Sequence, residues 1–205
     1  MRSQLRSALP SIPPIVPTLK PDPFNHPAWL FEPKYDGFRG MLYLSRSGCN
    51  LYSKRGNLMT RFAGLARQLA AELGARELIL DGEIVALDDE GRIDFSGLMR
   101  GQGTLAYAAF DLLWLNGQDL RSRSLQRRKR RLDRLIPASV GALNRIPCFS
   151  GEGRELFEAA CRLDLEGIVA KRKDDCYAPD TAWYKIKNST YTQAEGRAEL
   201  FERQR

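Results

Sequence analysis

Short apolar runs alternate with polar turns along much of the chain and predict a series of β-strands. Residues 29–34, 38–45 and 49–54 are rich in aromatic and aliphatic side chains and are separated by Asp-Gly and Ser-Gly pairs. Such pairs are typical of the turns between antiparallel strands. Two longer apolar runs, 77–88 and 105–116, predict further strands.

A different spacing marks the predicted helices. Within residues 59–73 the apolar side chains recur at helical intervals and Gly74 ends the pattern; they are Phe62, Leu65, Ala66, Leu69 and Leu73. The later segments are a basic helix at 122–135, an amphipathic helix at 155–163, strands at 167–172 and 182–188, and a polar end at 191–205 that forms a short helix or a frayed tail. Strands outnumber helices and most connections look antiparallel. The predicted class is therefore α+β, with antiparallel sheets flanked by helices.

Proline divides the chain. Seven of the eleven prolines lie within residues 9–27. Proline fixes φ and removes a backbone donor, so this stretch is predicted to be extended. The predicted organisation is a proline-rich lead-in at 1–27, a main domain at 28–188 and a polar tail at 189–205.

Composition narrows the class of protein. Hydrophobic residues make up 43% and charged residues 28% of the 205 residues, as in ordinary globular proteins. No apolar stretch approaches the roughly 18–20 residues that span a bilayer, and the N-terminus lacks the apolar region of a secretory signal. We expect a cytoplasmic protein. The four cysteines lack the short spacing of a zinc site and are expected to be free thiols; they are Cys49, Cys148, Cys161 and Cys176.

Charge and histidine content limit the chemistry. The net charge is +7 and the pI is about 9.4, which favours a polyanionic partner such as nucleic acid or a membrane surface. His26 is the only histidine and lies in the proline-rich stretch, where we expect a surface side chain. Most mechanisms that depend on a histidine base are therefore excluded.

A lysine beside a tight turn is the first candidate for chemistry. Asp36-Gly37 predicts a turn that places Lys34 and Arg39 on either side of the bend. A lysine held in this way acts as a nucleophile once its amine is deprotonated. The alternative is a hairpin that carries surface charges.

Two carboxylates interrupt an apolar strand further along. Asp81 and Glu83 are two residues apart, so they point to the same face of the strand. A buried carboxylate requires a cation, a metal or hydrogen-bond donors. A magnesium ion bound with a phosphate meets that need, and a turn at the strand edge is the alternative.

Cationic segments complete the candidates. Residues 53–57 form a turn in which Arg55 is suited to phosphate or ribose hydroxyls. Residues 166–172 begin with an acidic residue, continue through a short apolar stretch and end with two basic residues. Lys185 and Lys187 alternate with Ile186, so both ammonium groups face one side of a strand, as is suited to a polyphosphate. For each segment a solvated surface remains the alternative.

Residues 121–134 are dominated by arginine. An apolar stripe of Leu125, Leu132 and Leu135 predicts a surface helix. Its basic side chains are suited to the backbone of duplex DNA, and a solvated helix face is the alternative.

The order of these segments resembles that of a known superfamily. In chain order they are the segment from Lys34 to Arg39, the turn at 53–57, Asp81-Gly82-Glu83, Phe110-Asp111, residues 166–171, and Lys185 with Lys187. This set resembles the motifs of the covalent nucleotidyltransferases, and most of all the adenylation domain of ATP-dependent DNA ligases. RNA ligases and mRNA capping enzymes belong to the same superfamily. The resemblance covers residues from about 15 to 188 and implies an ATP-grasp-like nucleotidyltransferase domain.

The resemblance also implies a role for individual residues. Lys34 would attack the α-phosphate of ATP, release pyrophosphate and hold AMP as a phosphoramidate. Glu32 and the backbone around Tyr35 would contact the edge of adenine, and Phe110 would stack on its ring. Arg39 would hold the ribose and phosphates.

The remaining roles concern metal and phosphate. Arg55 would act with Arg39. The ribose and a divalent metal, Mg²⁺ or Mn²⁺, would be held by Glu83 and Glu166. The α-phosphate and the pyrophosphate would be neutralised by Lys185 and Lys187. Lys171 matches the basic end of its motif, but simple alternation places it on the opposite face from Glu166, so Gly167 is expected to interrupt the strand.

The implied activity is that of a monomeric ligase acting on nicked duplex DNA, without a membrane partner. The alternatives are RNA ligation, capping, or a module that binds nucleotide or DNA without catalysis. Only 18 residues follow Lys187, whereas ligases usually continue into an OB-fold. We therefore expect no OB-fold here, so that the chain is truncated, relies on a partner for this domain, or is naturally minimal. The stretch from Tyr177 to Trp183 also lacks the Gly-Arg-Ser that often precedes the tryptophan.

Overall fold

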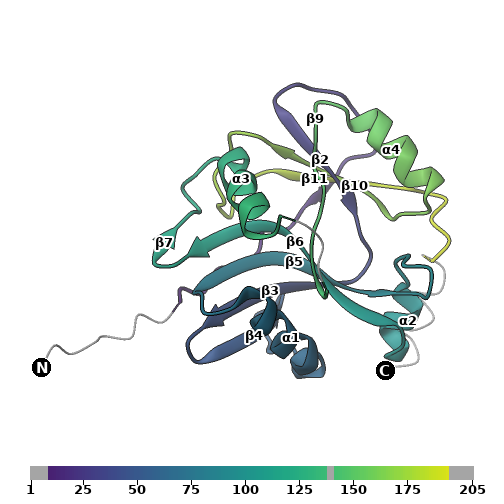
Figure 1. The fold of residues 1–205 in the computed structure, drawn as a ribbon. Helices are drawn as coiled ribbons and strands as arrows, with labels where there is room; N and C mark the ends of the chain where they lie inside the picture. Colours follow the sequence, from purple (N-terminus) through teal and green to yellow (C-terminus); the bar gives the residue numbers. More distant parts are fainter. Residues whose placement is uncertain (1–8, 138–140, 194–205) are drawn as a thin grey trace, which may run out of the picture.

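The computed structural model describes residues 9–137 and 141–193, which form two β-sheets packed face to face with helices on their outer sides (Figure 1). The first, here the small sheet, has the order β1-β11-β10-β2-β9. Its strands are β1 (Thr18–Leu19), β2 (Trp29–Lys34), β9 (Phe149–Ser150), β10 (Gly167–Arg172) and β11 (Trp183–Lys187). All of its pairs are antiparallel except β1 with β11.

The second, here the large sheet, has the order β4-β3-β5-β6-β7, with β8 paired in parallel to β6. Its strands are β3 (Phe38–Ser45), β4 (Gly48–Ser53), β5 (Leu78–Leu87), β6 (Thr104–Leu115), β7 (Gln118–Asp119) and β8 (Leu143–Arg145). The pairing of β5 with β6 shifts register near Asp81, where the ladder is irregular. The predicted α+β class with mostly antiparallel pairing is confirmed.

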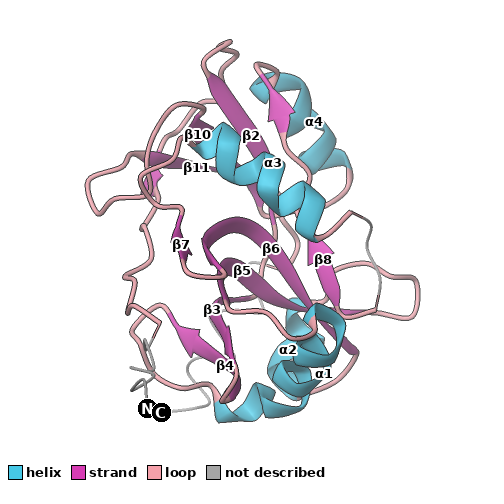
Figure 2. Ribbon diagram, turned by 60° about the vertical axis from the view of Figure 1, so that its left-hand side comes forward, coloured by secondary structure: helices cyan, strands magenta, loops and turns pink. Residues whose placement is uncertain are grey.

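Helices cover the outer face of each sheet (Figure 2). The 3₁₀ turn η1 (Thr60–Phe62), α1 (Ala63–Leu73) and α2 (Phe95–Arg100) pack on the large sheet, and α3 (Leu125–Leu135) packs beside β6. Helix α4 (Gly153–Arg162) packs on the small sheet. A further apolar core fills the space between the sheets, with Met41, Phe110 and Trp183 among its members.

Most predicted elements are present, with small shifts at their ends. The helix predicted at 59–73 begins with the 3₁₀ turn and ends at Gly74, whose φ of +68° suits glycine. Helix α2 was not predicted because it is only six residues long; the Asp94 carboxylate caps it by accepting from the Gly97 amide at 2.8 Å. The polar end predicted at 191–205 lies outside the described residues beyond 193.

Part of the proline-rich lead-in packs against the domain. The side chains of Ile12 and Ile15 are 4% and 3% exposed and join the core between the sheets. The Ile12 amide donates to the Tyr43 hydroxyl and the Ile15 amide donates to the Tyr177 hydroxyl. Among the described residues, no helix is both long enough and apolar enough to cross a bilayer.

Candidate functional site

The end of strand β2 places Lys34 at the edge of the space between the sheets. In the small sheet, Lys34 lies opposite Gly167, and Gly167 lies opposite Lys187. The Lys34 ammonium forms an ion pair with the Glu166 carboxylate, and the Lys187 Nζ lies 3.8 Å from the other oxygen of that carboxylate. The Lys34 side chain remains 22% exposed, so it is in contact with solvent.

Gly167 explains how Glu166 reaches this face. Strand β10 begins at Gly167, whose φ is +138°, a value that L side chains rarely adopt. A Cβ at this position would lie 2.0 Å from the Ile186 carbonyl oxygen. The predicted interruption of the strand is therefore confirmed, and it allows Glu166 and Lys171 to act on the same side of the sheet.

The large sheet contributes an arginine that is held by a buried carboxylate. Arg39 lies opposite Glu83, and its guanidinium donates two hydrogen bonds of 2.5 Å to Asp81. Asp81 is fully buried and also accepts from the Tyr177 hydroxyl at 2.7 Å. Burial alone would lower the pKa of Arg39, but the Asp81 carboxylate outweighs it and raises this pKa. Asp81 thus positions Arg39.

Glu83 is a carboxylate whose pKa is shifted by its surroundings. Burial raises the pKa of Glu83 to about 7, and the Lys34 and Arg39 charges oppose that shift. The charges of Glu166 and Asp36 raise it further. Three carboxylates therefore surround Lys34 closely enough to influence one another, as is common where charged ligands bind.

Asp36 belongs to the same cluster. Its side chain is 2% exposed, and the Tyr191 hydroxyl donates to its carboxylate at 3.4 Å. Burial raises the pKa of Tyr191, and the charge of Asp36 adds to that effect. The turn after Lys34 is thereby tied to the segment that follows β11.

No group of three or more histidine, cysteine or acidic side chains with metal-binding geometry occurs within the described residues. Glu83 and Glu166 lie close enough for the charge of one to raise the pKa of the other. Mg²⁺ usually keeps several waters and is bound by one or two carboxylates together with substrate phosphates. The residues present thus fit a metal ion that binds with a phosphate-bearing substrate.

Glu32 is held by two lysines. It is 2% exposed, and its carboxylate lies 2.6 Å from the Lys171 Nζ and also contacts the Lys129 Nζ. The contact with Lys129 is close but poorly directed, since neither atom meets the geometry of a hydrogen bond. Burial lowers the pKa of Lys171 to about 8, which the Glu32 charge opposes and the Lys129 charge reinforces.

Lys129 was missed because the basic helix was predicted to lie on the surface. That prediction is wrong for Arg128 and Lys129, which are 0% and 4% exposed. Arg128 donates to both oxygens of the buried Asp111, at 2.8 and 3.0 Å. Positions 128 and 129 follow Leu125 by three and four residues, so helical spacing places them on its inward face. This spacing is the sequence signal that identifies Arg128 and Lys129 as inward-facing residues.

Phe110 lies deeper than Lys34, whereas Tyr35 is half-buried as Lys34 is. Phe110 is 7% exposed; the Arg39 Cζ lies 4.6 Å and the Lys171 Nζ 4.2 Å from its ring centre. Burial raises the pKa of the Tyr35 hydroxyl. Stacking of Phe110 on a base and contact of Glu32 with its edge remain predictions.

The two lysines that are predicted to bind phosphate both lie on β11 of the small sheet, where Lys187 is in the same register row as Lys34. Lys185 and Lys187 share one face of β11, while Ile186 lies in the core under α4. Lys187 is 53% exposed and Lys185 is half-buried. The predicted alternation along this strand is confirmed.

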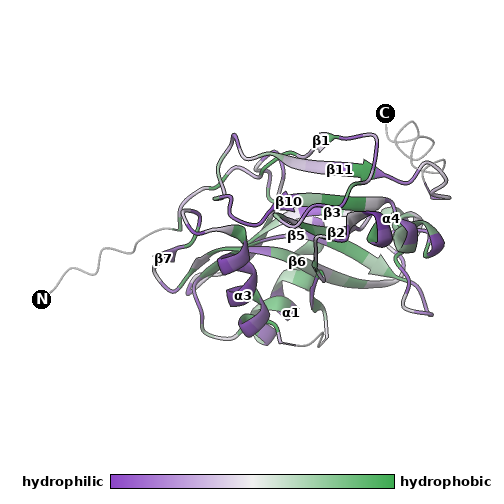
Figure 3. Ribbon diagram, turned by 90° about the horizontal axis from the view of Figure 1, so that it is seen from above, coloured by the Kyte–Doolittle hydropathy of each residue, from purple (hydrophilic) through white to green (hydrophobic). Residues whose placement is uncertain are grey.

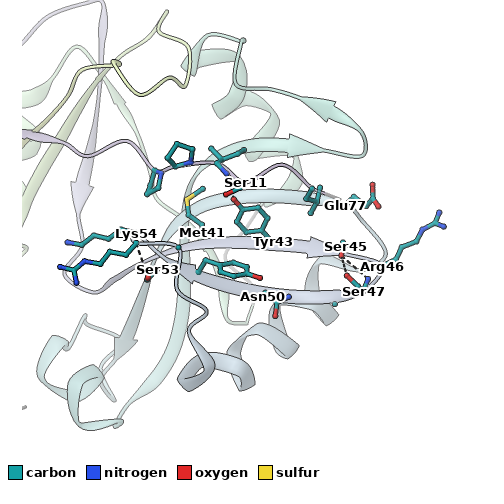
Figure 4. A pocket seen from close by; sticks show the side chains of 18 residues that line it. Ser11, Met41, Tyr43, Ser45, Arg46, Ser47, Asn50, Ser53, Lys54 and Glu77 are labelled. Carbon is teal, nitrogen blue, oxygen red and sulfur yellow. Dashed lines mark hydrogen bonds between the residues drawn. The ribbon is translucent and has the colours of Figure 1, made fainter. Parts of the chain in front are cut away.

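Arg55 is exposed and lies outside this network of contacts. It lines a groove of about 1210 Å³ together with Tyr52. Figure 4 shows three other residues of this groove, Lys54, Tyr43 and Met41. In the described part of the chain, no hydrogen bond or ion pair joins Arg55 to Lys34 or Glu166. Its predicted contact with ribose and phosphates remains a prediction.

Comparison with known proteins agrees with this geometry. Residues 20–187 match the family described as "ATP dependent DNA ligase domain". The chain belongs to this family. It is 34% identical over 168 residues to the multifunctional non-homologous end joining protein LigD of Pseudomonas aeruginosa, covering 78% of the chain and 20% of that protein. It is 33% identical over 207 residues to the bifunctional LigD of Bacillus subtilis, covering 84% and 33% respectively.

Solved structures of ligase domains share the fold. A mycobacterial DNA ligase D complexed with ATP and MES aligns with a TM-score of 0.76 and 31% identity, covering 85% of this chain and 60% of that one. The Chlorella virus DNA ligase-adenylate aligns with a TM-score of 0.57 at 16% identity, covering 84% and 69%, which shows the shared fold alone. This ligase-family chain thus spans about a fifth to a third of the length of the LigD proteins that it matches.

Proposed function

We propose that this chain is the catalytic adenylation domain of an ATP-dependent DNA ligase and that Lys34 is its nucleophile. One observation carries the proposal. The Lys34 ammonium meets the Glu166 carboxylate where the two sheets converge, with Lys187 and the Glu83 carboxylate beside it. Membership of the ligase family and the likeness to a structure described as complexed with ATP and MES support it.

In the first step the Lys34 Nζ attacks the α-phosphorus of ATP. A P–N bond forms, the P–O bond to pyrophosphate breaks, and the amine gives up its proton. Phosphoryl transfer requires chiefly positioning and positive charge. Lys185 and Lys187 supply that charge on the face of the small sheet that carries Lys34, and Arg39, fixed by Asp81, supplies it from the large sheet.

Glu166 keeps Lys34 in place before the reaction. Attack uses the lone pair of the amine, so it requires this ion pair to open first. Glu83 and Glu166 would hold Mg²⁺ or Mn²⁺ with the phosphates of ATP, and the ion would neutralise charge on those phosphates.

In the second step the 5′-phosphate of nicked duplex DNA takes the AMP from Lys34, so that the P–N bond breaks and a phosphoanhydride bond forms. A 3′-hydroxyl then attacks that 5′-phosphate, forms the phosphodiester bond that seals the nick, and displaces AMP. The net charge of +7 favours such a polyanion. The groove at Lys54 and Arg55 adds cations that form no ion pair with any described residue. The relatives are named for non-homologous end joining, and we propose DNA repair as the setting.

The organisation of the working enzyme is also part of the proposal. We propose a cytoplasmic monomer that works with an OB-fold supplied by further chain or by a partner. The resemblance to ligases, which usually contain an OB-fold, supports the part of the proposal that concerns this domain.

Covalent labelling tests the proposal. Incubation with α-labelled ATP and magnesium should leave label on the protein, and Lys34→Ala should abolish it, while Lys20→Ala on the edge of the small sheet should retain it. Label that persists in Lys34→Ala would refute the nucleophile. Binding of ATP or DNA by the unaltered chain without a covalent adduct would instead indicate a non-catalytic module.

A further inference from the structure

A hollow lined by arginines lies beside α3, on the side away from Glu32. Its volume is about 250 Å³, and its lining residues are Leu120, Arg123, Arg127, Arg128 and Arg131. Arg127 and Arg131 lie one turn apart on α3, about 6 Å along its axis. Arg123 lies in the loop just before this helix, which begins at Leu125. The three arginines line the same hollow and are here called the row. Figure 3 shows the hydrophilic character of this helix.

Three of the four arginines in this hollow have no carboxylate counter-ion in the described chain, whereas the fourth, Arg128, is paired with Asp111. The lining includes no carboxylate. The nearby Asp119 is engaged by Arg121 at 2.6 Å, and Asp133 is engaged by Arg145 at 2.8 Å. Arg123 and Arg127 form no ion pair with a described residue, and Arg131 donates only to the Gln118 side chain at 2.7 Å. Like charges that converge in this way repel one another unless an anion binds.

The hollow is built on a rigid base. Arg128 forms part of it and is locked by Asp111 in the core. The first amides of α3 are also engaged, because the Leu125 amide donates to the Asp175 carbonyl and the Gln126 amide to the Lys173 carbonyl, both at 2.9 Å. The arginines therefore provide the site for an anion, and the helix N-terminus does not.

The hollow lies near the candidate active site. On the opposite side of α3, Lys129 contacts Glu32, which precedes Lys34 by two residues. A helix is about 10–12 Å across and two strand residues span about 7 Å, so the hollow lies within roughly 20–25 Å of the lysine. One turn of B-DNA spans roughly 34 Å.

We propose that Arg123, Arg127 and Arg131 bind phosphodiester groups of the duplex within one turn of the nick that Lys34 acts on. This inference rests on the proposed ligase function. The guanidinium groups neutralise backbone phosphates and release counter-ions. The contact is independent of base sequence and orients the duplex.

The test compares two triple variants of this chain. Arg123→Gln/Arg127→Gln/Arg131→Gln removes the row, and Arg67→Gln/Arg154→Gln/Arg162→Gln removes three exposed arginines from α1 and α4. Binding of a labelled nicked duplex is measured by anisotropy from 50 to 300 mM salt, with thermal unfolding as a check of folding. Self-adenylation with α-labelled ATP is measured in parallel.

Loss of the row should weaken nicked-duplex binding about tenfold or more, and should lower the slope of log K against log salt by about one unit per arginine. Self-adenylation should be unchanged, the α1/α4 variant should bind nearly as the unaltered chain does, and replacement of the row by lysines should restore most of the slope. Equal effects of the two triple variants would overturn the proposal. So would a raised KM for ATP with unchanged duplex binding, which would assign the hollow to the nucleotide.

The two proposals fail in distinguishable ways. If the unaltered chain forms no lysyl-AMP, the proposed function fails. If it forms the adduct and binds the nicked duplex, but the row variant binds with the same affinity and salt slope, only the present inference fails.

Discussion

Arg128→Met should strongly destabilise the fold. The change leaves the Asp111 carboxylate buried without its cation, since both residues are 0% exposed. Removing one partner of a buried pair costs about 3–5 kcal/mol. The loss also removes donors to the Arg123 and Asp175 carbonyls, which tie α3 to its neighbouring loops. A domain of ordinary stability has about 5–15 kcal/mol in total, so the loss is a large fraction of it.

Urea unfolding followed by circular dichroism measures this loss of free energy. Thermal unfolding measures the melting temperature, which should fall by roughly 6–20 °C at about 2–4 °C per kcal/mol for a chain of this size. Arg130→Met, an exposed neighbour on the same helix, should change stability by less than about 0.5 kcal/mol. The double variant Arg128→Met/Asp111→Asn should be more stable than Arg128→Met, because it leaves no unpaired charge.

Two results would refute this reasoning. A loss below about 1 kcal/mol in Arg128→Met would show that Asp111 is solvated or finds another partner. A double variant no more stable than Arg128→Met would show that the packing of the arginine stem, and not the buried charge, is what matters.

Three further outcomes are expected. Gly167→Ala should destabilise the fold and reduce lysyl-AMP formation, because its Cβ would lie 2.0 Å from the Ile186 carbonyl oxygen; thermal unfolding and labelling measure both effects, and a variant as stable as the parent would contradict the assignment. Burial lowers the pKa of Lys171 to about 8 from 10.5, so the unfolded chain binds more protons between these values, and the free energy of unfolding should rise with pH across that window. That rise should be smaller in Lys171→Met, and equal slopes would be inconsistent with the shift. Burial raises the pKa of the Cys49 thiol to about 11, so at pH 8 a disulfide reagent should modify the exposed Cys176 first and leave Cys49 unreacted until the chain unfolds.

Local patterns in the sequence determined the strands and their turns. Alternation along β11 placed Lys185 and Lys187 on one face, and Asp36-Gly37 marked the bend after Lys34. These features depend on residues within a few positions of one another, where side-chain periodicity and turn chemistry act directly. The order of the motifs then indicated the ligase family, which the comparisons confirmed.

The tertiary structure decided which charges meet. Lys34 contacts Glu166 across 132 residues, and Lys171 contacts Glu32 across 139. Such pairs depend on sheet register and on Gly167, whose positive φ redirects the chain before β10. Helix α3 could likewise be recognised as basic from the sequence, but the buried Asp111 that draws Arg128 inward was decided by packing against β6. The physical reason is that a buried charge settles where a partner compensates its desolvation, and that partner is set by the whole fold.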